Sequence, residues 1–88
     1  MRITLLGKRW NLLFAPPEKG NRGDIDPPHT RGKTIRICPK LQDLAELDTL
    51  VHELLHAADW HRDEEWIETV ATDISRVLWK LNYRRQDA

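Results

Sequence analysis

The most regular hydrophobic pattern of the chain lies in its second half. Apolar residues recur at helical spacing before residue 60, at Leu41, Leu44, Leu47, Val51, Leu54, Leu55 and Ala58. They recur with the same period after residue 65, at Trp66, Ile67, Val70, Ile74, Val77, Leu78 and Leu81. This spacing predicts two amphipathic helices, over about 43–60 and 64–81. Asp63 is the expected N-cap of the second helix, with Glu64 and Glu65 in its first turn.

The first half of the chain shows the period of two that is typical of strands. Apolar residues alternate over 2–14, at Ile3, Leu5, Trp10, Leu12 and Phe14, and predict a hairpin with a turn at Gly7-Lys8. Residues 34–38 alternate again and predict a short strand that ends at Pro39. Residues 15–33 hold four prolines and three glycines and predict a long loop. The order of elements indicates one α+β domain over residues 1–88.

Composition and charge narrow the classes of protein to which this chain could belong. Hydrophobic residues make up 40% and charged residues 32%, as in an ordinary globular domain. The 14 basic and 14 acidic residues give zero net charge, so we expect neither nucleic acid nor a membrane as a partner. Cys38 is the single cysteine and allows no internal disulfide. With no apolar run long enough for a signal peptide or a membrane span, we expect a cytoplasmic protein.

The chemistry of the chain is indicated by His52-Glu53-Leu54-Leu55-His56, which fits the pattern H-E-x-x-H. The pattern lies inside the first predicted helix, where residues four apart share one face. His52 and His56 can therefore bind one ion, and imidazole nitrogen suits zinc. Glu53 lies about 100° around the helix from His52, where it can take a proton from a water that zinc activates. We expect one zinc ion per chain, with His52 and His56 as ligands and Glu53 as the catalytic residue.

The third metal ligand is less closely defined by the sequence. In a metzincin, Gly and His follow the second histidine at fixed spacing, but here Asp59 and Arg62 occupy those positions. His61 and Asp59 are weak alternatives, because His61 is one residue short of the required position and Asp59 would still be helical. A gluzincin instead takes a glutamate from the next helix, where the candidates are Glu64, Glu65 and Glu68.

Among the three glutamates, Glu68 is the preferred third ligand. Glu64 and Glu65 belong to the first turn of the second helix, where the helix dipole and solvent exposure explain them. Glu68 lies one turn deeper, beside the apolar Ile67, and Thr72 one turn further on could hydrogen-bond to it. The sequence therefore predicts the metal set His52, His56 and Glu68, with Glu65, Glu64 and His61 as the alternatives.

Residues 47–57, Leu-Asp-Thr-Leu-Val-His-Glu-Leu-Leu-His-Ala, resemble the active-site helix of small gluzincin-like metallopeptidases. These include the ImmA/IrrE-like and minigluzincin proteins and short phage-encoded proteins assigned as metallopeptidases. In the ImmA/IrrE-like group the glutamate ligand opens a stretch E-x-x-A-N-x-F-A. Residues 68–75, Glu-Thr-Val-Ala-Thr-Asp-Ile-Ser, are similar, with Thr72 where asparagine is usual. His56 and Glu68 are closer in sequence than in most gluzincins, which requires a tight turn at 61–63.

The resemblance implies a small zincin-like domain: an N-terminal hairpin and a short edge strand, packed on the two C-terminal helices. It also implies a peptidase, and the third of the groups named above is phage-encoded. An extended peptide would lie along the edge of strand 34–38, and Glu53 would pass a proton to the leaving amine. His29, His61 and Tyr83 are candidates to stabilise the oxyanion, and each also has an ordinary structural explanation.

Two other functions compete with that of a peptidase. The same scaffold could bind zinc with little catalysis and hold a partner at strand 34–38 or at loop 15–33, since a small domain offers little wall for a cleft. The two helices could also form a helix-turn-helix that binds DNA, although zero net charge and the acidic run Asp63, Glu64 and Glu65 disfavour it. The sequence defines neither the substrate nor the oligomeric state.

Overall fold

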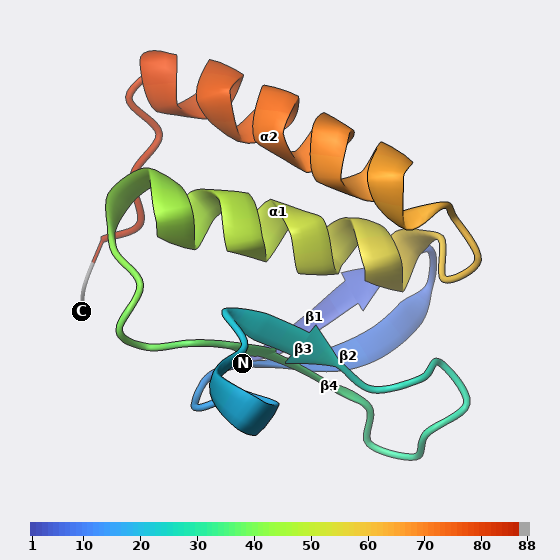
Figure 1. The fold of residues 1–88 in the computed structure, drawn as a ribbon. Coiled ribbons are helices and arrows are strands. Elements are labelled where there is room, and N and C mark those ends of the chain that lie inside the picture. Colours follow the sequence, from blue (N-terminus) through green and yellow to red (C-terminus); the bar gives the residue numbers. More distant parts are fainter. Residues whose placement is uncertain (87–88) are drawn as a thin grey trace.

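A four-stranded mixed sheet and two helices make up residues 1–86, the part of the chain that the computed structural model describes (Figure 1). The strands are β1 (Arg2–Leu5), β2 (Lys8–Phe14), β3 (Gly23–Ile25) and β4 (Thr34–Ile37). A single 3₁₀ turn, η1 (Glu18–Gly20), precedes β3, and the helices α1 (Asp43–Ala58) and α2 (Glu64–Lys80) follow β4. The predicted α+β class is confirmed.

The two helices begin at the residues that the apolar periodicity predicted and end one or two residues earlier. Asp63 is the N-cap of α2, and its side chain accepts a hydrogen bond from the Trp66 backbone N–H at 3.0 Å. α1 packs on the sheet, and α2 lies on the side of α1 away from the sheet (Figure 1). Within residues 1–86, no helix combines the length and apolarity needed to cross a bilayer.

The hydrophobic core lies between one face of the sheet and α1. Its buried side chains come from the two central strands, at Trp10, Leu12, Ile35 and Ile37. Leu50, Leu54 and Ala57 of α1 pack against them, and these residues share one helical face. The core therefore holds α1 in a fixed position over β4 and β3, and both histidines of the H-E-x-x-H pattern lie on this helix.

The predicted N-terminal hairpin is present, but its turn lies one residue earlier than expected. β1 and β2 pair antiparallel with Leu5 opposite Lys8, so the two-residue turn is Leu6-Gly7. Both turn residues have positive φ, 50° at Leu6 and 75° at Gly7, as a type I′ turn requires. Leu6 is exposed and adopts a backbone conformation that is uncommon for leucine. For this reason the sequence favoured Gly7-Lys8 as the turn.

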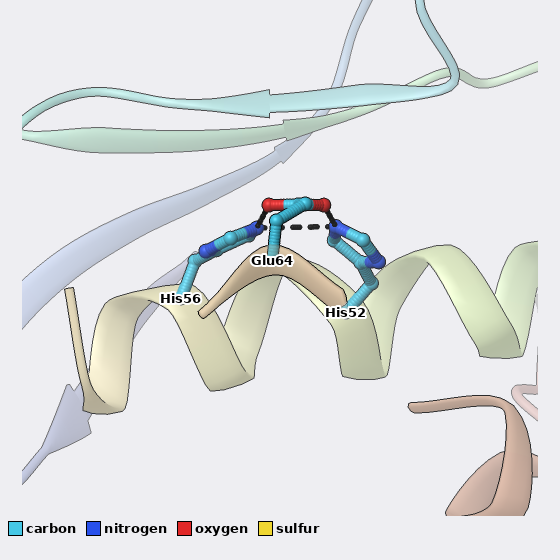
Figure 2. A group of neighbouring side chains, drawn as sticks. All are labelled: His52, His56 and Glu64. Atoms are coloured by element: carbon cyan, nitrogen blue, oxygen red, sulfur yellow. Dashed lines mark hydrogen bonds and ion pairs between the residues drawn. The ribbon is translucent and has the colours of Figure 1, made fainter. Parts of the chain in front are cut away.

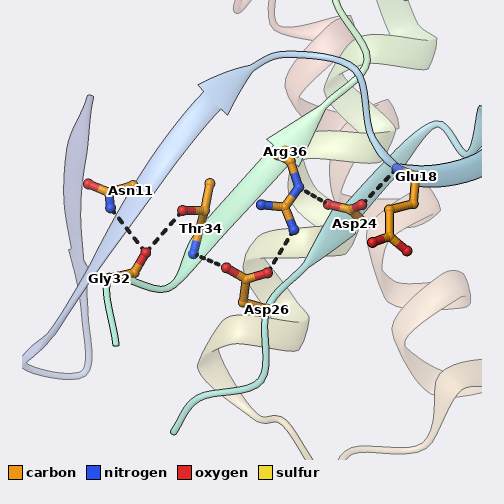
Figure 3. A network of polar contacts seen from close by, with 7 residues as sticks. All are labelled: Asn11, Glu18, Asp24, Asp26, Gly32, Thr34 and Arg36. Atoms are coloured by element: carbon orange, nitrogen blue, oxygen red, sulfur yellow. Dashed lines mark hydrogen bonds and ion pairs between the residues drawn. The ribbon is translucent and has the colours of Figure 1, made fainter. Parts of the chain in front are cut away.

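The prediction of an unbroken loop over residues 15–33 is wrong for residues 23–25, which form β3. This strand pairs antiparallel with β4, and Asp24 lies opposite Arg36. The Arg36 guanidinium bridges two carboxylates, with Nε 2.6 Å from Asp24 and an Nη 2.7 Å from Asp26 (Figure 3). Gly-Asp-Ile has little strand propensity of its own, so its conformation depends on these contacts with β4.

The strand predicted at 34–38 is present as β4, but it is not an edge strand. The strand order is β1-β2-β4-β3, so β4 pairs in parallel with β2 on one side and antiparallel with β3 on the other. Since both of its edges are already hydrogen-bonded, a peptide cannot add to it as a further strand. The edge strand nearest α1 is β3.

The ion pairs between β3 and β4 predict a loss of stability in acid. The hydrogen bond from Arg36 lowers the pKa of the Asp26 carboxyl, and a backbone hydrogen bond from Thr34 also lowers it. As the pH falls, the Asp26 carboxyl is therefore protonated in the unfolded chain before it is protonated in the folded one. The stability that its ion pair contributes is complete above about pH 4 and is lost as the pH falls through the lowered pKa. Asp26→Asn should reduce stability at neutral pH and flatten its dependence on pH below about 4.

Urea unfolding of both proteins between pH 2 and pH 7 measures this effect. Asp73→Asn is the control, because Asp73 is an exposed residue of α2 that makes no ion pair among the described residues. Parallel pH profiles for the wild type and Asp26→Asn would contradict the prediction.

Candidate metal centre

His52 and His56 converge at one point on the surface of α1. They lie four residues apart, so their side chains project from adjacent turns of one face. The two Nε2 atoms are 3.1 Å apart, and the rings meet edge to face with centroids 4.8 Å apart. Burial lowers the pKa of His56, which favours the neutral imidazole that binds metals. The predicted convergence of these two histidines is therefore seen in the structure.

Glu64 joins the two histidines from the start of α2. Its carboxylate lies between the rings, with Oε1 3.0 Å from Nε2 of His52 and Oε2 2.8 Å from Nε2 of His56 (Figure 2). The Asp63 cap determines where α2 begins, and the buried Ile67 one turn later packs the helix down. Cap and packing together hold Glu64 against the last turns of α1.

The carboxylate that the structure brings to the two histidines is that of Glu64, and not that of Glu68, the predicted third ligand. Glu68 is one helical turn further along α2, about 6 Å along its axis, and it lines the adjoining cavity together with Thr72. Among the described residues, neither Glu68 nor the alternatives Glu65 and His61 makes a hydrogen bond or ion pair with either histidine. The expected hydrogen bond between Thr72 and Glu68 is not formed within residues 1–86, where the Thr72 carbonyl accepts one from Ser75.

The position of Glu64 beside the histidines follows from the short connection between the helices. α1 ends at Ala58, just after His56, and only five residues connect it to α2. An antiparallel second helix must then begin beside the last turn of the first, so its first residue lies nearest the histidines. The sequence contains this spacing, but it did not predict Glu64 as the residue beside the histidines. A glutamate in a first helical turn is already explained by the helix dipole.

The three side chains lie close enough together to share one metal ion. The two histidine nitrogens are 3.1 Å apart, and each lies within 3.0 Å of a different oxygen of the Glu64 carboxylate. With one ligand atom from each residue, the three atoms lie within 4.8 Å of one another. Two imidazoles and one carboxylate are a ligand set of catalytic zinc, which keeps a fourth position for water or substrate. His52, His56 and Glu64 could thus hold a metal ion.

Glu53 is buried beside this set and has no hydrogen-bonding partner among the described residues. Its side chain is 9% exposed, and Oε1 lies 3.9 Å from Nε2 of His52. Burial raises the pKa of the Glu53 carboxyl to about 7, and the negative charges of Asp24 and Glu64 contribute to the rise. A cation held by the three ligands would favour the ionised carboxylate. Glu53 therefore has a position and an acidity suited to proton transfer near neutral pH.

β3 crosses directly over this site, and Gly23 makes the close approach possible. A Cβ atom at residue 23 would lie 2.9 Å from Cγ2 of Thr49 and 3.2 Å from Cγ of Glu53. Both of these α1 residues are buried under the strand. The absence of a side chain at Gly23 thus sets the distance between the strand and Glu53.

Gly23→Ala should destabilise the protein by about 1–3 kcal/mol, the usual effect of an extra methyl group in a packed interior. The new methyl would force β3 away from α1, because its nearest neighbour, the Thr49 methyl, is itself enclosed. Thr49→Ser removes that methyl, so the double variant Gly23→Ala/Thr49→Ser should recover part of the loss. Urea unfolding of the two single variants and the double variant measures the coupling. Additive effects would contradict the proposed contact.

Cavities open on both sides of the metal set, along the line of β3. One of about 630 Å³ is bounded by Arg22, Asp48 and Glu68, and the other, of about 560 Å³, by Trp60 and Arg62. Gly23, His52, Glu53 and Glu64 line both of them. The site is therefore the centre of a longer depression between β3 and the two helices.

The free edge of β3 faces this depression. The residues flanking β3 are hydrogen-bonded toward β4: the Cys38 N–H donates to the Arg22 C=O, and the Asp26 N–H donates to the Thr34 C=O. In an antiparallel pair the bonded residues alternate, so the backbone groups of Gly23 and Ile25 point away from β4. These groups are available to hydrogen-bond an extended chain.

The residues considered for an oxyanion partner lie elsewhere. His29 and His61 are exposed in loops, and Tyr83 lines a separate cavity at the other end of α1. Arg62 does border the site, with its guanidinium 4.5 Å from the Trp66 ring and Nε 3.1 Å from Asp59. It is a cationic donor at the edge of the metal set, and sequence reasoning considered this position only as a missing histidine.

Comparisons with known proteins add no relative to this picture. No protein-family model matches the chain. The curated proteins and the solved structures likewise contain no significant match. The function must therefore be argued from the metal centre itself.

Proposed function

We propose that the protein is a zinc-dependent peptidase. The observation that carries the proposal is the carboxylate of Glu64 between His52 and His56, with the buried Glu53 beside them. The three residues offer ligand atoms that lie within 4.8 Å of one another, and the fourth group is a carboxyl whose pKa is raised to about 7. A set of surface histidines with no chemical role would give no reason for a carboxyl largely removed from water beside them.

Each group of the site has a distinct role in this proposal. His52, His56 and Glu64 hold the metal, which when bound lowers the pKa of water and polarises a carbonyl. Glu53 takes the proton of the attacking water and returns it to the leaving amine. Arg62 borders the cavity on the side of Trp60, where its guanidinium can donate to the oxygen that becomes negative.

The substrate is an extended peptide that adds to the free edge of β3. The outward backbone groups of Gly23 and Ile25 bind its main chain, in place of the predicted contact with strand 34–38. The cavities on either side of the metal set receive the side chains that flank the cleaved bond. This arrangement brings the peptide carbonyl next to both the metal set and Glu53.

Digestion of a mixed peptide library by the zinc-loaded protein, with mass spectrometry of the products, tests the proposal. Cleavage should require zinc, stop on addition of a chelator, and be lost together with bound zinc in His52→Ala. His61→Ala is the matched control, because His61 lies in the exposed turn between the helices and should keep both properties.

The same experiment distinguishes a peptidase from a metal-binding protein without catalysis. One zinc per chain with no cleavage of any peptide would favour the interaction protein on the same scaffold. Absence of zinc binding would exclude both functions.

A further inference from the structure

The cavity bounded by Asp48 and Glu68 continues the metal set by one helical turn. Asp48 precedes His52 by four residues on α1. Glu68 follows Glu64 by four residues on α2. Because the two helices are antiparallel, both steps run in the same direction, and each covers about 6 Å along its helix (Figure 1). Asp48 and Glu68 therefore line one cavity, of about 630 Å³, from opposite helices.

Within residues 1–86, no cation forms an ion pair with either of these two carboxylates. Arg22 also lines the cavity, but its guanidinium donates a hydrogen bond to the Ala45 carbonyl at 3.1 Å. Asp48 and Glu68 do not form a second metal site, because the one group of ligating side chains that could hold an ion among the described residues is the metal set itself. The cavity thus offers negative charge to an organic cation.

The rest of the cavity wall is also suited to a charged group. Apart from two glycines, every described residue that lines it has a polar or charged side chain, including Asn21, Thr49 and Thr72. Glu53 lines it as well, with a side chain that is 9% exposed and makes no hydrogen bond within residues 1–86. An apolar side chain would find no apolar surface here, whereas a cation would be attracted by the carboxylates.

β3 runs from this cavity toward the cavity on the other side of the metal set. Gly23 lines both cavities, Arg22 lines the first and Ile25 the second. The second cavity has apolar surface, from Ile25 and Trp60. A peptide that pairs antiparallel with β3, the more stable arrangement, runs from the second cavity to the first. The residue that follows the cleaved bond then enters the cavity of Asp48 and Glu68.

We propose that the cavity lined by Asp48 and Glu68 is a specificity pocket for the lysine or arginine side chain that follows the cleaved bond. This inference rests on the proposed peptidase function and names the class of peptide that the site cleaves. The ammonium or guanidinium group binds between the two carboxylates, one from each helix. Hydrogen bonds between charged groups are roughly twice as strong as those between neutral groups. Asp48 and Glu68 thus select the substrate and take no part in the chemical step.

Cleavage of matched peptides by the full zinc-loaded chain tests the proposal. The peptides are identical except for the residue after the cleaved bond, which is lysine, norleucine or glutamate. Mass spectrometry of the products identifies the bond that is cleaved. The kcat/KM of the wild type for the lysine peptide should exceed that for the norleucine peptide by about 10–100-fold, the usual contribution of a hydrogen bond to a charged group. The glutamate peptide should be the poorest substrate, because its carboxylate would meet two others.

Removing each charge in turn shows whether these carboxylates cause the preference. In Asp48→Asn and in Glu68→Gln, the ratio of kcat/KM for the lysine peptide to that for the norleucine peptide should fall about tenfold. Partial loss of zinc or of folded protein does not change this ratio, because the same active molecules cleave both peptides. Glu65→Gln is the matched control, since Glu65 is exposed on α2 and does not line the cavity, and it should keep the wild-type ratio.

The outcomes separate failure of this inference from failure of the proposed function. Equal kcat/KM for the lysine and norleucine peptides would overturn the specificity pocket and leave the peptidase in place. So would an unchanged ratio in either Asp48→Asn or Glu68→Gln, or a preference for lysine before the cleaved bond instead of after it. If no peptide were cleaved at all, the peptidase function and the pocket that rests on it would both be rejected.

Discussion

Replacing Glu64 with glutamine should weaken zinc binding by at least about 100-fold, more than loss of a hydrogen-bonding partner of a metal ligand usually does. The Glu64 carboxylate lies within 3.0 Å of both histidine nitrogens, whereas the Glu53 carboxylate approaches only His52, at 3.9 Å. Glutamine keeps the size of the Glu64 side chain and removes its charge. Competition with a chromophoric chelator measures the dissociation constant.

Glu68→Gln and Glu65→Gln are matched controls for this experiment. They make the same chemical change in the same helix, one turn or one residue away, at exposed positions that form no hydrogen bond or ion pair with either histidine within residues 1–86. Both should bind zinc within about threefold of the wild type, since a surface charge this distant contributes less than about 1 kcal/mol. A larger loss in Glu68→Gln than in Glu64→Gln would restore the ligand set His52, His56 and Glu68 that the sequence favoured.

Replacing Glu53 with glutamine should lower the rate of peptide cleavage by about 10²–10⁴-fold, the contribution of a general base. Zinc should remain bound, because Glu53 is 3.9 Å from the nearest histidine nitrogen and is not among the three converging ligands. Glutamine is also tolerated by the fold, since a neutral amide is less costly to bury than a carboxylate. Zinc content and the initial rate of cleavage are measured on the same sample.

Glu46→Gln is the control for Glu53→Gln. Glu46 also lies on α1, but its carboxylate pairs with Arg85 at the opposite end of the helix from His56. This variant should cleave at the wild-type rate. If Glu53→Gln cleaved as fast as the wild type, Glu53 would not be the base, and the mechanism proposed for the site would be wrong.

The prediction of the helices and the histidine pair succeeded because both depend on short-range spacing. Apolar residues every three to four positions define a helical face wherever the helix packs. The turn of the helix itself brings His52 and His56 together, with no contribution from the rest of the chain. The same reasoning identified Asp63 as the cap of α2, since a cap bonds within its own first turn.

The sequence did not predict β3 or the approach of Glu64 to the histidines, because both depend on contacts between residues distant in sequence. Gly23–Ile25 becomes a strand through its ladder with β4 and through the contacts of Asp24 and Asp26 with Arg36. Because β3 pairs with β4, β4 is an interior strand, and a peptide can add only beyond β3 on that side of the sheet. Similarly, Glu64 is a first-turn acid by sequence and joins the two histidines only when α2 folds back on α1.

By itself the sequence determined the α+β class, the two helices and a pair of imidazoles that can share one ion. These are properties of local periodicity and composition, and they hold for many arrangements of the same elements. The tertiary structure alone decided which carboxylate meets the imidazoles, which strand borders them, and that Glu53 is buried. Those features depend on the packing of α2 against α1 and of β3 against β4, and no local pattern records distances between segments that meet only on folding.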